Sequence, residues 1–182
     1  MKIGGGSYTL SDRNLVLEIE AGFDLSGQRC RYILLGENGS GKTSFLEKIL
    51  LPALDSHDVD YLYIGQDIRN QLYTLRALLA TMGLSVIGAG ERELLRVWAA
   101  HSPTAKVLIM DEFDKYFSDY EFMFEWTKTV IPLSFVVTHH DEPMRPRYEE
   151  STGRVCRVRF EPIGQDGRLK RVRIRQEQPC PC

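Results

Sequence analysis

One short segment constrains the fold of this chain more than any other: residues 36–43 fit the pattern G-x-x-x-x-G-K-[ST]. The apolar run before it, residues 31–35, is typical of a buried strand. The run after it, residues 43–51, is typical of a short helix that ends at Pro52. Backbone N–H groups of such a glycine loop and of the helix N-terminus point at an anion. The segment therefore predicts a cradle for the phosphate chain of a nucleotide.

The predicted cradle gives roles to individual side chains. Lys42 would reach the β- and γ-phosphates, and the Thr43 hydroxyl would bind Mg²⁺. The residues expected to contact the nucleotide are those of the motif and its next neighbour: Gly36, Glu37, Asn38, Gly39, Ser40, Gly41, Lys42, Thr43 and Ser44.

Length and composition favour a single globular domain. The chain has 182 residues, a net charge of −2 and a hydrophobic fraction of 43%, which is ordinary for a soluble protein. No apolar run approaches the roughly 18 residues that cross a membrane, and residues 1–6 lack the apolar segment of a secretory signal. We therefore expect one domain over residues 1–178, in a cytoplasmic protein that meets a membrane only as a peripheral subunit on its inner face, through a partner.

The four cysteines fall into two groups. Cys30 and Cys156 each stand alone in an apolar pattern, which is typical of small core residues. Cys180 and Cys182 end the chain, and no set of His or Cys at zinc-binding spacing accompanies them. Metal binding and a disulfide are the alternatives for this end, and we favour a mobile tail over residues 179–182.

Strand-like and helix-like runs alternate along the chain. Short, continuous apolar runs are typical of a parallel sheet covered on both faces, and they occur at residues 32–35, 61–64, 107–110 and 135–137. Helical periodicity occurs between or beside them, at residues 68–82, 91–101 and 120–130. The pattern predicts an α/β three-layer domain with a mainly parallel core sheet and its ligand at the C-terminal ends of the strands.

Alternating runs at both ends of the chain add antiparallel strands. Residues 8–10 and 15–19 predict an N-terminal antiparallel β part, and residues 154–160 and 171–175 predict a C-terminal β-hairpin with its turn at 164–167. In the hairpin, arginines share a face of each strand: Arg157 and Arg159, then Arg171, Arg173 and Arg175. This face suits a nucleic-acid or anionic-lipid patch, or a solvated face on edge strands, and we favour the second interpretation.

Polar residues follow three of the predicted core strands, where a nucleotide pocket would lie. Asp111 ends an apolar strand and can hold Mg²⁺ through water, and Glu112 can orient and deprotonate an attacking water. Gln66 follows the strand at 61–64 and can reach Mg²⁺ or that water. His139 follows the strand at 135–137 and can hydrogen-bond the γ-phosphate. Together with the glycine loop, Asp111 and Glu112 predict a site for Mg²⁺ and an attacking water. By themselves, Gln66 also suits an ordinary turn and His139 a surface residue.

In this order, the pieces resemble the ATP-binding cassette (ABC) ATPase family. Its Walker A motif looks like residues 36–43, its Q-loop like Gln66, its Walker B motif and catalytic glutamate like Asp111 and Glu112, and its switch histidine like His139. Tyr8 stands about where the family places an aromatic residue that stacks on adenine. The resemblance covers nearly the whole chain and implies the three-layer fold of P-loop NTPases, with ATP and Mg²⁺ as cofactors. It also implies a catalytic site built from Glu112, Gln66 and His139, with Thr43, Gln66 and Asp111 at the metal.

The sequence also departs from the family pattern. The signature loop Leu-Ser-Gly-Gly-Gln is matched only by Gly88, Ala89, Gly90 and Glu91, which lack the serine hydroxyl. At the register of the family's D-loop aspartate stands Ser118, with Asp119 one step later. The stretch between Gln66 and Gly88 has room for one helix, so we expect a reduced helical subdomain. This puts membrane coupling in doubt more than ATP binding.

The resemblance implies ATP hydrolysis at a dimer interface, with the other chain's signature loop closing over the γ-phosphate. The dimer would form with a second copy or with a related ATPase chain, and its closure would drive a separate membrane permease. A soluble ABC-type ATPase that acts on nucleic acid or on a protein complex is a second class, and a weakly hydrolysing nucleotide-dependent regulator is a third. Direct binding of nucleic acid is not favoured.

Overall fold

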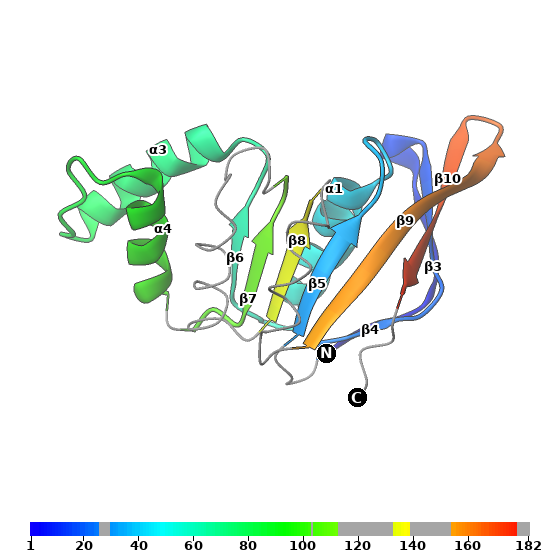
Figure 1. Cartoon of the computed structure of the whole chain (residues 1–182), viewed down its shortest axis with the longest axis horizontal. Coiled ribbons are helices and arrows are strands. Elements are labelled where there is room, and N and C mark those ends of the chain that lie inside the picture. Colours follow the sequence, from blue (N-terminus) through cyan, green and yellow to red (C-terminus); the bar gives the residue numbers. More distant parts are fainter. Residues whose placement is uncertain (26–29, 103, 113–132, 139–153, 178–182) are drawn as a thin grey trace.

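The computed structural model describes residues 1–25, 30–102, 104–112, 133–138 and 154–177 (Figure 1). Its ten strands are β1 Lys2–Ile3, β2 Gly6–Leu10, β3 Leu15–Ile19, β4 Phe23–Asp24, β5 Cys30–Leu35, β6 Tyr61–Ile64, β7 Val107–Met110, β8 Leu133–Val137, β9 Arg154–Asp166 and β10 Leu169–Gln176. The α-helices are α1 Lys42–Phe45, α2 Leu51–Ser56, α3 Ile68–Thr81 and α4 Glu91–Ala100. The predicted helix at 120–130 and the tail at 179–182 lie outside the described residues.

Eight strands form one sheet in the order β2-β3-β10-β9-β5-β8-β7-β6, and β1 pairs with β4 in a separate two-stranded sheet. The five strands from β9 to β6 all run parallel to one another, which confirms the mainly parallel core. The pair β2–β3 is antiparallel, as predicted for the N-terminal part. β8 lies between β5, which leads into the glycine loop, and β7, which leads to Asp111.

The central strands are buried on both faces, as their unbroken apolar sequences predict. All residues of β5, β7 and β8 are buried. Along β5, Ile33 and Leu35 join the cluster that contains α3 and α4, while Tyr32 and Leu34 join the cluster on the other face. On that second face the rings of Tyr32 and Phe135 stack with their centres 4.7 Å apart. The two clusters make the sheet the middle layer of the molecule and fix the ends of its strands in space.

The helix after the glycine loop does not end at Pro52. α1 continues through a π-helical turn, Leu46–Leu50, directly into α2, and Pro52 lies in the first turn of α2. The N–H of Leu51 donates to the carbonyl of Leu46, five residues back. A proline ring clashes with the carbonyl one turn earlier in a regular α-helix, and the wider π turn relieves that clash. The prediction of a short helix stopped at Pro52 was therefore wrong.

The C-terminal hairpin is antiparallel as predicted, but it is longer, and its turn lies later. Residues 164–166, predicted as turn, still pair with β10, with Gly164 opposite Arg171. The hairpin is also not at an edge of the sheet: β9 pairs with β5, and β10 pairs in parallel with β3. The prediction of edge strands was wrong because the β3–β10 pairing joins the two ends of the chain, where no local pattern reports it.

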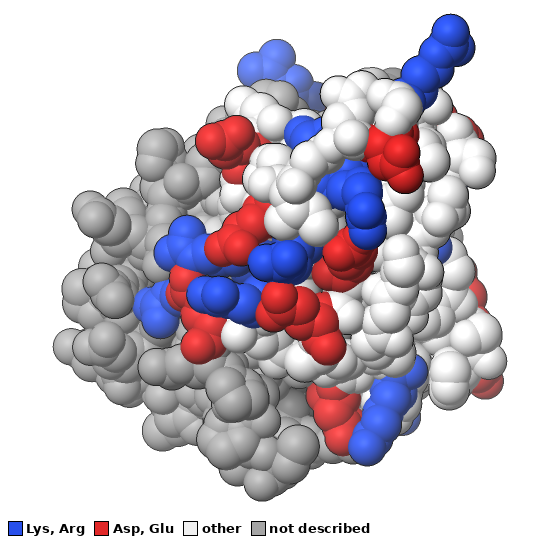
Figure 2. All heavy atoms as spheres, turned by 90° about the vertical axis from the view of Figure 1, so that its right-hand side faces the viewer, with Lys and Arg blue, Asp and Glu red and all other residues white. Residues whose placement is uncertain are grey.

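The arginines of the hairpin are interleaved with acids from neighbouring strands. Arg171 is paired with Glu18, Arg173 Nε lies 3.2 Å from Glu20, and Arg159 is paired with Glu177. Figure 2 shows the result on this side of the molecule, where positive and negative side chains alternate. The described face thus carries mixed charge, which suits a solvated surface more than a cationic patch.

The two predicted helices of the middle region are present as α3 and α4. Among the described residues, no helix is both long and apolar enough to cross a membrane.

Candidate functional site

The glycine loop passes so close to two strands that certain positions accept only glycine. Gly36 has a φ of 154°, and a Cβ there would lie 2.8 Å from the carbonyl oxygen of Phe160 in β9. Gly41 has a φ of 90°, and its Cβ would lie 2.9 Å from the Leu15 side chain in β3. Residues that carry a Cβ rarely adopt backbone conformations with such positive φ values. The loop therefore packs against β9 and the start of β3, between the end of β5 and α1.

The Lys42 ammonium is buried inside this loop. Its Nζ donates to the carbonyl of Gly36 at 2.6 Å and to that of Glu37 at 2.9 Å, and it lies 3.4 Å from the Ser40 hydroxyl. The side chain is thereby stretched across the loop with its charge at the cavity, since Lys42 lines the cavity wall. A buried ammonium at a cavity wall attracts an anion strongly.

Opposite the loop, Asp111 presents a buried carboxylate. Asp111 is 1% exposed, and among the described residues none donates a hydrogen bond of normal distance and geometry to its oxygens, although the Thr43 and Gln66 side chains lie near them. Its backbone N–H donates to the Ile64 carbonyl at 2.8 Å and so fixes it at the end of β7. Nearby, Gln66 Nε2 donates to Thr43 Oγ1 at 2.8 Å. Buried polar groups without partners are rare in native proteins and call for an explanation, such as an ion.

The charges around Asp111 also favour a bound cation. Burial raises the pKa of the Asp111 carboxyl, the neighbouring charges of Glu112 and Glu47 raise it further, and the Thr43 and Gln66 side chains act in the opposite direction. A cation beside the carboxylate would remove this penalty. The oxygen donors of Asp111, Thr43 and Gln66 suit Mg²⁺, so the residues present fit the predicted metal.

Glu112 is half-buried and lines the same cavity. Its φ is 51°, in the left-handed region, which is uncommon for residues with a Cβ and costs free energy. Strain of this kind concentrates at active sites, because the surrounding structure has to hold a side chain in one direction. The strained backbone thus places the Glu112 carboxylate beside Asp111.

These groups share one cavity of about 350 Å³. It brings together most of the predicted site: Asn38, Gly39, Ser40, Gly41, Lys42, Thr43, Ser44, Gln66, Asp111 and Glu112. Gly36 and Glu37 do not line it, but their carbonyls hold Lys42. His139, Ser118 and Asp119 lie outside the described residues.

Four residues line the cavity that the sequence did not indicate: Arg13, Leu15, Val137 and Lys170. Val137 ends β8, so the predicted sheet could have suggested it. The other three come from the antiparallel part, where β3 and β10 lie against the loop. No motif marks them, and only the β3–β10 pairing brings them to the site.

Comparison with known proteins leaves the family open. No family model matches the chain, and no curated protein matches it. Among solved structures, the chain is similar to a KaiC-like protein, PH0186, from the hyperthermophilic archaeon Pyrococcus horikoshii OT3, with a TM-score of 0.47 and 13% identity over 98% of this chain and 90% of that one. No family membership follows from a likeness at this level.

The fold class rests on the molecule itself. A buried strand, glycine loop and helix carry the lysine, and an acid ends a second parallel strand with one strand between them. This is an α/β P-loop NTPase fold. Membership of the ABC family stays a prediction.

Two predicted features, Tyr8 and the signature loop, do not line this cavity beside the glycine loop, which we call the P-loop cavity. The Tyr8 hydroxyl donates to the Gly4 carbonyl at 2.8 Å, and its ring packs against the core on β2, outside the cavity lining. Stacking of Tyr8 on adenine stays a prediction.

The predicted signature loop opens a helix, as expected, with Gly90 as the N-cap of α4. Glu91 and Glu93 in the first turn place negative charge at this helix end, where an anion would bind. A role of Gly88, Ala89, Gly90 and Glu91 at the γ-phosphate of a second chain stays a prediction.

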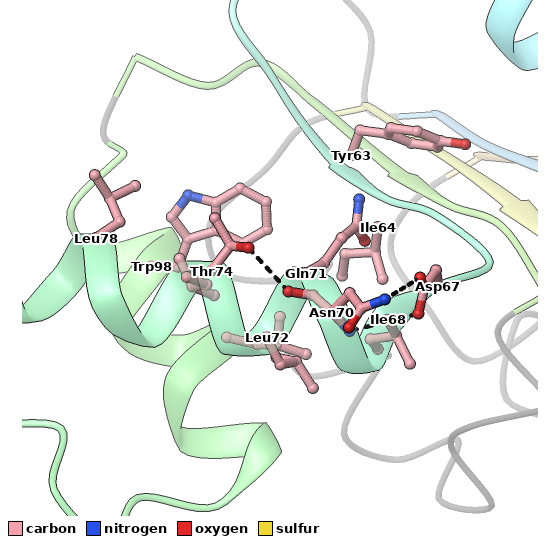
Figure 3. A pocket seen from close by; sticks show the side chains of 12 residues that line it. Tyr63, Ile64, Asp67, Ile68, Asn70, Gln71, Leu72, Thr74, Leu78 and Trp98 are labelled. Atoms are coloured by element: carbon pink, nitrogen blue, oxygen red, sulfur yellow. Dashed lines mark hydrogen bonds between the residues drawn. The ribbon is translucent and has the colours of Figure 1, made fainter.

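A second cavity, of about 390 Å³, lies between α3, α4 and β6. Figure 3 shows its lining, which is mainly apolar, with Leu72 and Trp98 among the side chains, and includes the polar residues Asp67, Asn70, Gln71 and Thr74. The start of α3 is fixed beside it: Asp67 accepts from the N–H of Asn70 at 3.4 Å, and Gln71 Oε1 accepts from the N–H of Gly65 at 2.8 Å. These contacts lie on both sides of Gln66 and hold it near Thr43.

Proposed function

We propose that this chain binds and hydrolyses ATP with Mg²⁺ in the P-loop cavity. The observation that carries the proposal is that two buried groups of opposite charge line one cavity: the ammonium of Lys42, and the carboxylate of Asp111, which has no hydrogen-bond partner among the described residues. A bare glycine turn would explain neither group. A Mg-bound triphosphate satisfies both at once.

The chemistry of each side chain gives it a separate role in the proposed hydrolysis. Lys42 and the loop N–H groups bind the phosphate chain, and Asp111, Thr43 and Gln66 hold the metal, which when bound supplies positive charge to the phosphate oxygens. Glu112 accepts a proton from the attacking water while the water oxygen bonds to the γ-phosphorus and the bond to the ADP oxygen breaks. Positioning and charge account for most of the acceleration in such transfers. The choice of adenine rests on the resemblance to the ABC family.

We propose in addition that ATP binding closes a dimer, with a second copy or a related ATPase chain, and that closure drives a separate membrane permease. Support comes from the exposed loop that opens α4, in which Ile87 is 98% exposed. Tyr73, Leu78 and Met82, which are large and apolar, are also exposed, on and after α3. Large exposed apolar side chains are available for contact with a partner.

The second candidate is a soluble ATPase that acts on a protein complex or nucleic acid. The observation in its favour is the short middle region, where the described residues between Gln66 and β7 form only α3 and α4. The mixed charge of the hairpin face gives nucleic acid little to bind, so the protein complex is the better version of this candidate.

The test is ATP hydrolysis by the purified full chain with and without Mg²⁺. We expect Lys42→Ala to weaken ATP binding by about tenfold or more, because a charged contact is lost. Glu112→Gln should retain binding and lose turnover by about a hundredfold or more. Lys106→Ala, at an exposed lysine, is the matched control. Wild-type protein that gives no calorimetric heat and no melting shift with any Mg-nucleoside triphosphate contradicts the proposal.

The dimer and its partner need separate measurements. Light scattering of Glu112→Gln with ATP should report a doubled mass that falls when ATP is removed. Purification of that variant from membranes and from cytosol distinguishes the two candidates. A multi-span membrane protein in stoichiometric amount supports the first, and recovery only with a soluble complex supports the second.

A further inference from the structure

Lys170 reaches the glycine loop from the far end of the sequence. It lies in β10, where its N–H donates to the Asn14 carbonyl at 2.9 Å and its register partner is Leu15. Its Nζ donates to the carbonyl of Gly39, in the glycine loop, at 2.8 Å. The side chain is half-buried and lines the P-loop cavity. The β3–β10 pairing thus delivers a second lysine to the loop that holds Lys42.

Besides Lys42 and Lys170, a third cationic side chain lines the cavity, and it is already paired with acids. Arg13 lines the cavity, but its Nη2 lies 3.1 Å from Glu47, and Asp12 is also close. Lys170 makes no ion pair with a described residue, and its ammonium donates to a neutral carbonyl. A phosphate oxygen is a stronger acceptor than a carbonyl, because the hydrogen bond is charge-assisted on both sides. Movement of the Lys170 ammonium from the Gly39 carbonyl to an anion in the same cavity would therefore lower the free energy.

We propose that Lys170 is a second phosphate-binding cation of this site, which contacts the phosphate chain of the bound nucleotide from the β10 side of the loop. The inference rests on the proposed function. It adds a residue that neither the P-loop motif nor the strand-end acids contain. In this arrangement the nucleotide tail lies between two lysines, Lys42 inside the loop and Lys170 outside it.

The experiment compares ATP affinity, by calorimetry with Mg²⁺, in four proteins: wild type, Lys170→Met, Lys170→Arg and Lys106→Met. Methionine keeps the length and apolar stem of the side chain and removes the charge. Lys106 is an exposed lysine at the opposite end of β7, so Lys106→Met controls for the change in net charge. We expect Lys170→Met to weaken binding about tenfold, the low end for a charged hydrogen bond because Lys170 is half-exposed. Lys170→Arg should restore most of the affinity, and Lys106→Met should match wild type.

The salt dependence of ATP affinity and the melting temperature distinguish a phosphate contact from a purely structural role of Lys170 in holding the loop. If Lys170 binds phosphate, the defect of Lys170→Met shrinks between about 50 mM and about 500 mM salt, because screening weakens the lost interaction. The nucleotide-free variant should then melt within about 1 °C of wild type. A defect that is equal at both salt concentrations and accompanied by a lower melting temperature overturns the inference in favour of a prop for the loop.

The outcomes also separate this inference from the proposed function. Wild-type protein that binds ATP while Lys170→Met binds it equally well refutes the role of Lys170 alone. Wild-type protein that binds no nucleoside triphosphate overturns both proposals together.

Discussion

Replacing Asp111 by asparagine should make the nucleotide-free protein more stable at neutral pH and abolish its response to Mg-ATP. The carboxylate is 1% exposed, and its oxygens have no hydrogen-bond partner among the described residues. An amide of the same shape removes the buried charge, although it leaves a polar group there. Most substitutions of buried polar residues destabilise a protein, so a gain here would identify a group that is kept for its function.

The magnitude follows from the cost of a buried group that lacks partners. Such a group costs about 1–3 kcal/mol, and more when charged. Because the asparagine amide is itself unpartnered, we expect a net gain of about 1–2 kcal/mol, or roughly 2–8 °C in melting temperature for a chain of this length. Added Mg-ATP should raise the melting temperature of wild type and leave that of Asp111→Asn almost unchanged, because the metal has lost its carboxylate.

The pH dependence provides an independent check. Burial raises the pKa of Asp111 in the folded protein above the unfolded value of 3.8. Between the unfolded pKa and the higher folded pKa, the folded state binds more protons than the unfolded state. The contribution of Asp111 to the free energy of unfolding is therefore greatest at low pH and falls as pH rises through this window. This contribution to the slope should vanish in Asp111→Asn.

The assay is thermal unfolding of nucleotide-free protein from acid to neutral pH, with and without Mg-ATP. Asp166→Asn, at an exposed position of β9, is the control for loss of a negative charge. A variant that is less stable than wild type at neutral pH, and that keeps the wild-type slope in acid, would refute the reasoning. It would mean that Asp111 has partners in the folded protein and is held for packing.

Two further predictions concern the backbone of the site. Glu112→Gly should raise the free energy of unfolding by about 1 kcal/mol while turnover is lost, because glycine accepts the φ of 51° without strain; equal or lower stability in a urea titration would contradict it. Gly36→Ala should lower stability by about 2–4 kcal/mol more than Gly167→Ala, because both residues have positive φ but only at Gly36 would a Cβ meet a backbone oxygen, that of Phe160, at 2.8 Å. Equal losses in the two alanine variants would show that the close contact relaxes.

The sequence predicted the parts of this structure that depend on local pattern. Unbroken apolar runs identify β5, β7 and β8, because a strand covered on both faces needs apolar residues at every position. The glycine loop and Asp111 follow from the same reasoning, since each is defined by what precedes it in the chain. In each of these cases the pattern that predicts the element lies within about ten residues of it.

The parts that failed leave no mark in the local pattern of residue types. Pro52 continues a helix because of a π turn that leaves no mark in the residue types. β10 became an interior strand because β3 pairs with it, a contact between opposite ends of the chain. Lys170 could not be predicted for the same reason, since nothing near it in the sequence resembles a phosphate site. Register between distant strands is decided by packing of the whole sheet.

Three features coincide at the ends of β5 and β7: a buried ammonium at Lys42, a buried acid at Asp111 whose oxygens have no hydrogen-bond partner among the described residues, and a strained backbone at Glu112. A buried group without partners and a strained backbone each cost free energy in the nucleotide-free protein. Lys42 Nζ donates to the carbonyls of Gly36 and Glu37 in the loop, and among the described residues it makes no hydrogen bond with the Asp111 carboxylate. A ligand with negative charge at one end and a metal beside it would lower the energy of both, so the instability of the empty site becomes binding energy for a Mg-bound phosphate chain.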